Sequence, residues 1–262
     1  MGKIYAREIK LNNKFNLKQI LTKKKINKNS KCVKEFFKRK DLDIFIIASP
    51  ITTHFKYLKY AYAANKDIII EKPLVENQNQ LKKLVLLNKN FKKKVLIHHN
   101  DVLNFEKSKI IQKFVKFKKI KKVEMIYGKK EYRNSFIKPH FDWLPHPIAV
   151  MFNLFGEPKK FQILDYVKVN KKNIILENLD LFFTFKNFKV FVKFSNNLKN
   201  PCKKITIYQD NKKLIYDGYI PKNQRTIKIL LEKYYFSNTI NDINSYINAY
   251  KLLFKIDKKL IN

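Results

Sequence analysis

The chain has 262 residues, enough for one large domain or two smaller ones, each with its own core. Hydrophobic residues make up 45% of the sequence and aromatic residues 14%, which excludes a disordered polyelectrolyte despite a formal net charge of +36. No apolar run approaches the roughly 20 residues that span a bilayer, and the N-terminus lacks the apolar stretch of a signal peptide. We therefore expect a cytoplasmic protein without a membrane partner.

The positive charge raises the question of nucleic-acid binding. Arginine occupies only four positions, so 53 of the 57 basic residues are lysine, and they are spread along the whole chain. Proteins that read a nucleic-acid sequence favour arginine, whose planar fork binds guanine or phosphate at two points. So much lysine, together with abundant Asn, Ile and Phe, indicates a bias toward A/T-rich codons. We expect no specific nucleic-acid partner, and a general polyanion-binding surface stays an alternative that salt-dependent DNA retention would support.

Residues 41–100 alternate apolar runs with helical patterns. The runs at 41–50, 67–73 and 93–100 are typical of buried parallel strands. The segments between them, 52–66 and 77–90, have helical spacing, and Thr52 or Thr53 is the expected N-cap of the first. Strands and helices that alternate with short connections predict βαβ units and a parallel sheet.

The pattern changes after a predicted helix at 106–117. Apolar and polar residues then alternate at period two in a series of segments, which predicts an antiparallel sheet with one wet face. These segments begin at residue 121 and continue at 158–169, 178–187, 188–197 and 203–220. A closing amphipathic helix is predicted at 240–260. The fold class is therefore α/β: a Rossmann-like parallel-sheet domain at 1–103, then an α+β domain at 104–262 with a large, mostly antiparallel open sheet.

Three motifs in this order resemble the Gfo/Idh/MocA oxidoreductases. The first is "DLDIFIIASPITTHFKYLKYAYAANKDIIIEKPL", in which a strand ends in Ser49-Pro50, a histidine follows, and the next strand ends in Glu-Lys-Pro. The second is "VLIHHNDVLNF", and the third is "FDWLPHPIAVMFNLFGEPKK", which is similar to the family's Asp-x-x-x-His segment. The resemblance covers most of residues 1–160. It implies an NAD(P)-dependent dehydrogenase or reductase that acts on a hydroxyl or keto carbon of a sugar, sugar nucleotide or cyclitol.

The resemblance places Lys72 where the nicotinamide ring and the substrate hydroxyl meet. An ammonium group there can hydrogen-bond the reacting oxygen and orient its proton. Glu71 would hold this lysine or a cofactor hydroxyl, and Pro73 would set the turn. Ser49, Pro50 and His54 are further implied cofactor neighbours, although a purely structural role for His54 is an equal alternative. Without the motifs, Glu71 and Lys72 would read as a solvated pair after a strand.

Asp142 and His146 are the candidate acid-base and substrate residues. They lie four apart, and in the first turn of a helix such residues share a face, where Pro145 and Pro147 are tolerated. The resemblance gives both a catalytic and substrate-binding role. Their alternative interpretation is a capping aspartate and a core histidine.

The remaining histidines are less clearly assigned. His98 and His99 end a predicted strand, and because they face opposite ways at most one can neighbour the substrate; we favour His99. No motif includes His140, which is expected at the surface.

The start of the chain departs from the family pattern. The family begins with a strand and a Gly-x-Gly-x-x-Gly turn that lets the backbone approach a pyrophosphate. Here "MGKIYAREIK" resembles the end of that turn and its helix, so Gly2 would be the second glycine and the first strand would be missing. The DNA upstream of Met1 would show whether an in-frame strand and glycine turn precede it. If none does, the alternative is a catalytically impaired relative with a structural role or none.

The next predicted strand, 15–25, bears on the choice of cofactor. Members that use NAD usually place an acid at its end for the ribose 2′-hydroxyl. Here stand Thr22, Lys23 and Lys24, which could accept the 2′-phosphate of NADP, so NADP is slightly favoured over NAD. Lysine is common enough in this chain to fall there by chance, and the missing acid is the better argument.

Two further expectations concern partners and metals. Alternating aromatics in "LDLFFTFKNFKVFVKF" predict more apolar surface than one layer of helices covers, and hence a homo-oligomer, most simply a dimer joined through the open sheets. Cys32 and Cys202 fit no metal or redox spacing, so they are expected to be free thiols, and no metal site is expected.

Overall fold

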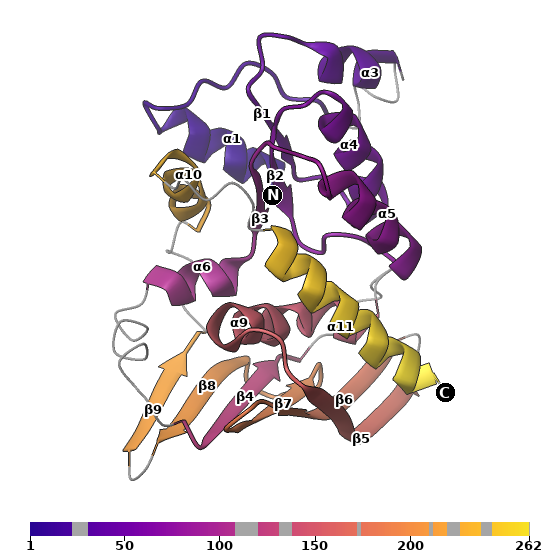
Figure 1. Ribbon diagram of the computed structural model, residues 1–262, viewed down its shortest axis with the longest axis vertical. Coiled ribbons are helices and arrows are strands. Elements are labelled where there is room, and N and C mark those ends of the chain that lie inside the picture. Colours follow the sequence, from indigo (N-terminus) through magenta and orange to yellow (C-terminus); the bar gives the residue numbers. More distant parts are fainter. Residues whose placement is uncertain are drawn as a thin grey trace. The chain divides into compact units, whose positions relative to one another are not determined.

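The computed structural model describes residues 1–22, 31–107, 120–130, 138–171, 174–209, 212–218, 226–236 and 243–261 (Figure 1). The chain forms two compact units, Met1–His98 with Arg225–Asn244, and His99–Gln224 with Ser245–Asn262. The division therefore falls between His98 and His99 rather than after residue 103, and a later segment joins the first unit. The reason is that α10 (Thr226–Phe236) packs on β3 and on α1.

The first unit is built on a three-stranded parallel sheet. Its strands are β1 (Ile44–Ile47), β2 (Asp67–Glu71) and β3 (Val95–His98), in the order β1-β2-β3. Ile68, Ile69 and Ile70 in the central strand are fully buried. A parallel strand covered on both faces needs such a continuous apolar run. The three predicted strands are confirmed.

Helices flank this sheet, and three of them were predicted: those at the start of the chain, at 52–66 and at 77–90. The helices of the unit are α1 (Gly2–Lys10), α3 (Lys31–Lys38), α4 (Ile51–Ala63), α5 (Gln78–Asn88) and α10. The predicted helices 52–66 and 77–90 correspond to α4 and α5. The N-cap of α4 is Pro50, so the assignment to Thr52 or Thr53 was wrong; the Thr53 hydroxyl instead donates to the Pro50 carbonyl. Asn77 caps α5 by accepting from the Gln80 amide.

The predicted strand at 15–25 is not formed in its described part. Residues 15–22 have no strand, and residues 23–25 lie outside the described residues. A strand needs a neighbour to pair its backbone groups, and among the described strands β1 pairs only with β2. Residues 15–22 therefore form no part of the sheet.

The second unit is built on a six-stranded sheet in the order β5-β6-β7-β4-β8-β9. All neighbouring pairs are antiparallel except β4 with β7, which are parallel. The strands are β4 (Lys122–Gly128), β5 (Lys160–Lys171), β6 (Ile174–Thr184), β7 (Lys189–Ser195), β8 (Cys202–Gln209) and β9 (Lys212–Asp217). The predicted large, mostly antiparallel sheet is confirmed.

One face of this sheet is covered and the other is open. Period-two alternation sends Leu181, Val192, Met125 and Ile205, which lie in one row across four strands, into the core. The helices of this unit lie on that side (Figure 1). They are α6 (Asn100–Lys107), α8 (Pro139–Trp143), α9 (Pro145–Phe155) and α11 (Ile243–Ile261). The closing helix predicted at 240–260 is α11, whereas α6 was not predicted. Of the helix predicted at 106–117, residues 108–117 lie outside the described residues.

The described helices are also too short or too polar to cross a bilayer.

Candidate functional site

The carboxyl ends of the parallel strands gather the motif residues of the first unit. Ser49 and Pro50 follow β1, Glu71 ends β2 and is followed by Lys72 and Pro73, and His98 ends β3. Lys72 is half-buried and precedes a cis peptide bond to Pro73. Open α/β sheets bind their ligands at this edge. The Glu-Lys-Pro sequence therefore lies on the central strand at the functional edge.

Glu71 is held by a histidine that sequence reasoning left aside. Its Oε1 atom lies 2.6 Å from His98 Nδ1, and His98 Nε2 lies 3.0 Å from the hydroxyl of Thr226. The ring of Tyr5 meets that of His98 edge-on at 5.4 Å. Burial first, and then the Glu71 carboxylate, raise the pKa of Tyr5 well above its ordinary value. Glu71 is thus part of a buried polar cluster behind Lys72.

His54 connects the turns after β1 and β2, which carry motif residues. It is almost completely buried, and its Nδ1 and Nε2 atoms lie 2.7 and 2.8 Å from the backbone carbonyl oxygens of Pro73 and Ser49. Both ring nitrogens are therefore used within the protein. These contacts favour the structural alternative, in which His54 sets the distance between the turns after β1 and β2.

In the second unit, His146 pairs with an aspartate near the start of α6. His146 Nδ1 lies 2.8 Å from Asp101 Oδ2, and Lys203 Nζ lies 2.8 Å from Asp101 Oδ1 and 3.1 Å from Oδ2. Burial alone would raise the pKa of Asp101, but His146 and Lys203 outweigh it and hold the pKa well below its usual range. Asp101 is therefore a buried carboxylate that accepts from Lys203 and lies beside His146.

Asp142 does not lie in the same helix as His146. Helix α8 ends at Trp143 and α9 begins at Pro145, which has no N–H group to continue the α8 ladder. The prediction that both side chains share the first turn of one helix was wrong for this reason. Asp142 is half-buried, and the carboxylate on His146 Nδ1 is that of Asp101.

His99 lies beside His146 in the same unit. Its ring centroid is 5.0 Å from that of His146 and 5.7 Å from that of Tyr246, and its Nε2 lies 3.2 Å from the Pro145 carbonyl oxygen. His98 and His99 are both buried but have different neighbours, since His98 contacts Glu71. The preference for His99 as the substrate neighbour stays a prediction.

His140 is buried, so its expected place at the surface was wrong. Its Nδ1 lies 2.8 Å from Glu177 Oε2, and its Nε2 lies 2.9 Å from Asp257 Oδ1. Glu177 also accepts from the His140 amide and from the Tyr166 hydroxyl. These partners, from β5, β6 and α11, are distant in sequence, and no local pattern reveals them.

Asp101, Lys203 and His98 were not found by sequence reasoning. Asp101 lies within the quoted "VLIHHNDVLNF" segment, so an acid beside a motif was the available signal. Lys203 gave none, because lysine is common everywhere in the chain. Of the predicted 2′-phosphate contacts, Thr22 is an exposed residue after the non-strand segment, and Lys23 lies outside the described residues.

A family comparison identifies the first unit. Residues 6–99 match a family model described as "Oxidoreductase family, NAD-binding Rossmann fold", GFO_IDH_MocA. Residues 6–99 therefore correspond to the NAD-binding domain of the Gfo/Idh/MocA oxidoreductases. The family and the fold are those of NAD(P)-dependent dehydrogenases and reductases. No curated protein sequence gives a significant match.

Solved structures have the same fold at low sequence identity. The dehydrogenase MviM of Clostridium difficile is similar with a TM-score of 0.75 and 16% identity, over 98% of this chain and 95% of that one. Biliverdin reductase from Synechocystis sp. PCC 6803, in complex with biliverdin and NADP+, gives 0.71 and 15%, over 98% and 94%. UDP-N-acetylglucosamine 3-dehydrogenase GnnA from Acidithiobacillus ferrooxidans gives 0.69 and 13%, over 86% and 80%.

The residues of the first unit fit the family's dinucleotide at two points. The Tyr5–His98 contact places the first turn of α1 at the carboxyl ends of the strands, where its unpaired N–H groups favour an anion such as a pyrophosphate. A Cβ added to Gly2 would meet no atom within 4 Å, so the protein's own packing does not require glycine there. Lys72 supplies a cation at the same edge. Gly2 and Lys72 are the residues that the resemblance assigns to the pyrophosphate and the nicotinamide.

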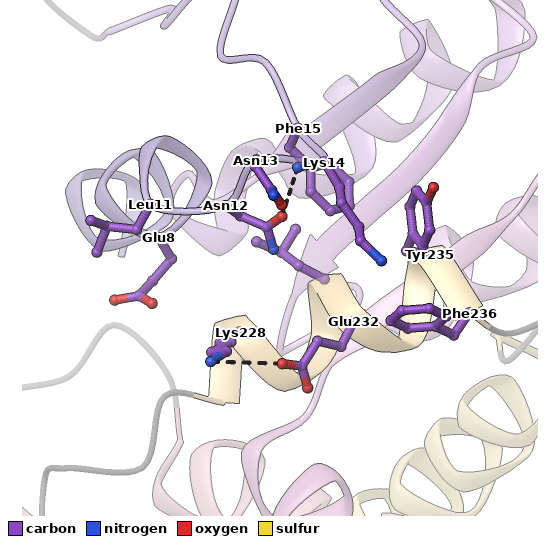
Figure 2. Close-up of a pocket in the computed structure, with 11 residues that line it drawn as sticks. Glu8, Leu11, Asn12, Asn13, Lys14, Phe15, Lys228, Glu232, Tyr235 and Phe236 are labelled. Atoms are coloured by element: carbon purple, nitrogen blue, oxygen red, sulfur yellow. Dashed lines mark hydrogen bonds and ion pairs between the residues drawn. The ribbon is translucent and has the colours of Figure 1, made fainter.

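The first unit also has a cavity of about 320 Å³ away from this edge (Figure 2). It lies between the end of α1 and the end of α10, and Lys14 Nζ lies 4.0 and 3.9 Å from the ring centroids of Tyr235 and Phe236. The neighbouring Tyr234 hydroxyl donates to Asp67, the first residue of β2. The end of the cavity that Tyr235 and Phe236 line therefore lies near the amino end of β2.

Proposed function

We propose that this family member oxidises a hydroxyl, or reduces the matching keto group, on a sugar, sugar nucleotide or cyclitol. The observation that carries the proposal is the position of Glu71-Lys72-Pro73 at the carboxyl end of the central parallel strand. The similarity to a UDP-N-acetylglucosamine dehydrogenase supports a sugar-type substrate. Biliverdin reductase shows that the same fold also serves a tetrapyrrole, so substrate class is the first point to test.

We infer one role for each residue of the predicted site. NAD(P) supplies the chemistry of the reaction by accepting or returning a hydride. Lys72 hydrogen-bonds the reacting oxygen and stabilises negative charge as the proton leaves. His146 takes that proton in the oxidation and returns it in the reduction, since imidazole exchanges protons near neutral pH. Asp142 and His99 orient the substrate hydroxyls.

We assign the cofactor as NADP ahead of NAD. Residues 15–25 contain no acid that could bind a ribose 2′-hydroxyl, while Thr22 and Lys23 could bind a 2′-phosphate. Titration of the purified chain with NADPH and with NADH, followed by calorimetry, tests this assignment. Tighter binding of NADH would contradict it. Binding of neither would favour the impaired-relative alternative.

The decisive experiment replaces Lys72 by alanine. With a panel of sugar, sugar-nucleotide and cyclitol substrates, we expect turnover to fall by about three orders of magnitude or more, because the group at the reacting oxygen is lost. Lys82→Ala, at an exposed position of α5, is the matched control and should keep full turnover. Equal turnover in the Lys72 variant would exclude the proposed role.

We also propose that the protein forms a homodimer through the open face of the six-stranded sheet. Phe182 and Phe191 pair edge-on at 4.9 Å on this face, and Ile126 and Ile215 are exposed on it. Phe191→Lys should shift the dimer toward monomer, because a charge would then lie in an apolar contact. Light scattering over a wide concentration range measures this. A wild-type monomer at every concentration would refute the proposal.

A further inference from the structure

Lys203 occupies a position where a strand normally places an apolar side chain. In β8, Ile205 and Ile207 point into the core, and alternation puts Lys203 on the same face. Its neighbour in register on strand β4 is the buried Tyr127. A lysine on the covered face of a sheet is costly unless an anion compensates it.

Asp101 is that anion, and it serves a second group as well. The side chain of Asp101 is nearly completely buried, and that of Lys203 is 17% exposed. Both Asp101 oxygens accept from Lys203 Nζ. Asp101 Oδ2 also lies beside His146 Nδ1. Lys203 Nζ further lies 5.7 Å from the Trp143 ring centroid. One carboxylate thus connects the amino group of Lys203 to the histidine proposed as the base.

We propose that Asp101 and Lys203 are positioning residues that set the tautomer and the proton affinity of His146. This inference rests on the proposed function, in which His146 exchanges the substrate proton. The negative charge of Asp101, 2.8 Å from Nδ1, favours the tautomer with its proton on Nδ1, in which the lone pair lies on Nε2. Lys203 cancels part of the Asp101 charge, which keeps the ring from holding its proton too tightly.

The two residues should therefore act on His146 in opposite directions. Removal of the Asp101 charge lowers the proton affinity of His146, whereas removal of the Lys203 charge leaves Asp101 uncompensated and raises it. Other titratable groups face this cluster from several elements: His99 before α6, Tyr127 on β4, Cys202 on β8, Tyr216 on β9 and Tyr246 on α11. Burial first, and then Asp101, raise the pKa of Tyr127 and of Tyr216, so both phenols stay neutral near pH 7.

The test compares Asp101→Asn and Lys203→Met with the wild-type protein. Histidine ring resonances, followed by NMR against pH without cofactor or substrate, report the pKa of His146, and His146→Gln identifies its signal. We expect shifts of about 1–3 pH units, downward for Asp101→Asn and upward for Lys203→Met. The acid limb of the pH–turnover profile should move the same way. Lys203→Arg should restore the wild-type value, and Lys204→Met, one residue away on the open face, is the control.

The outcomes separate this inference from the proposed function. Shifts in the same direction, or none, would overturn the inference whatever the turnover. Opposite shifts in a protein whose His146→Gln variant keeps full turnover would support the coupling and overturn the catalytic role of His146. If Asp101→Asn does not fold, the Lys203→Met arm decides alone, and an unmoved His146 pKa there would overturn the inference.

Discussion

Two buried histidines of the second unit, His146 and His140, have carboxylate partners but differ in what surrounds those carboxylates. The carboxylate beside His146 is that of Asp101, which also accepts from Lys203. His140 has Glu177 on one nitrogen and Asp257 on the other, so it links α8, β6 and α11. A carboxylate that is shared with a lysine can tune a histidine, whereas two carboxylates on one ring hold three elements together. We propose a chemical role for the first site and a structural role for the second.

The sharpest test of this comparison is His146→Gln. Glutamine can still donate to Asp101 but cannot exchange a proton, so we expect turnover to fall about 100- to 10,000-fold with the fold retained. Steady-state kinetics and circular dichroism measure the two effects. Unchanged turnover would remove the functional distinction between the two histidines.

His140→Ala should act on stability instead. It leaves Glu177 buried without its main donor, and breaking a buried pair in this way costs about 3–5 kcal/mol. Denaturant unfolding gives the change in the free energy of unfolding. Lys138→Ala, which removes an ion pair to the same Asp257 from a side chain that is 45% exposed, is the control and should cost only about 0–1 kcal/mol. A loss below about 1 kcal/mol for His140→Ala would contradict the structural role.

A smaller effect should appear in the pH dependence of stability. Burial alone would raise the pKa of Glu177, but the hydrogen bonds and charge of His140, with Tyr166, outweigh it and lower the pKa. A lowered folded-state pKa contributes stability that is present above the ordinary glutamate range and is lost as pH falls through the folded-state value. The Glu177→Gln variant should therefore lose less stability than the wild-type protein as pH falls below the ordinary pKa of glutamate. A slope equal to that of the wild-type protein would show that Glu177 does not drive this loss. The pKa of Asp101 is also lowered, so Asp101 should cause part of the acid destabilisation in both proteins.

Local sequence patterns predicted the strands and helices whose apolar periodicity is visible within a single segment. Ile68–Ile70 indicated a parallel strand covered on both faces, and the alternation in 178–195 indicated β6 and β7. Failures occurred where a distant partner or a backbone group decided the outcome. Residues 15–22 have strand-like composition but no strand beside them, and Pro145 separates Asp142 and His146 into two helices.

The candidate site divides in the same way. The order of its motifs indicated the family and singled out Lys72 and His146, because both lie in short segments with a definite spacing. Asp101 and Lys203 could not be paired from sequence, since 102 positions separate them and lysine is common throughout. The error at His140 has the same cause, because Glu177 and Asp257 lie 37 and 117 positions away.

The sequence by itself determined the resemblance to the Gfo/Idh/MocA family, the alternation of strands and helices in residues 41–100, and the open sheet. It also placed Lys72 after the central strand of the parallel sheet. These features depend on local spacing, apolar periodicity and short motifs, which the chain carries without reference to its fold. Only the tertiary structure decided which carboxylate each buried histidine meets, that His54 braces two loops, and that α10 packs on the first sheet. A buried polar group must find its partner wherever packing brings one within about 3 Å, and that neighbour is set by the fold rather than by distance along the chain.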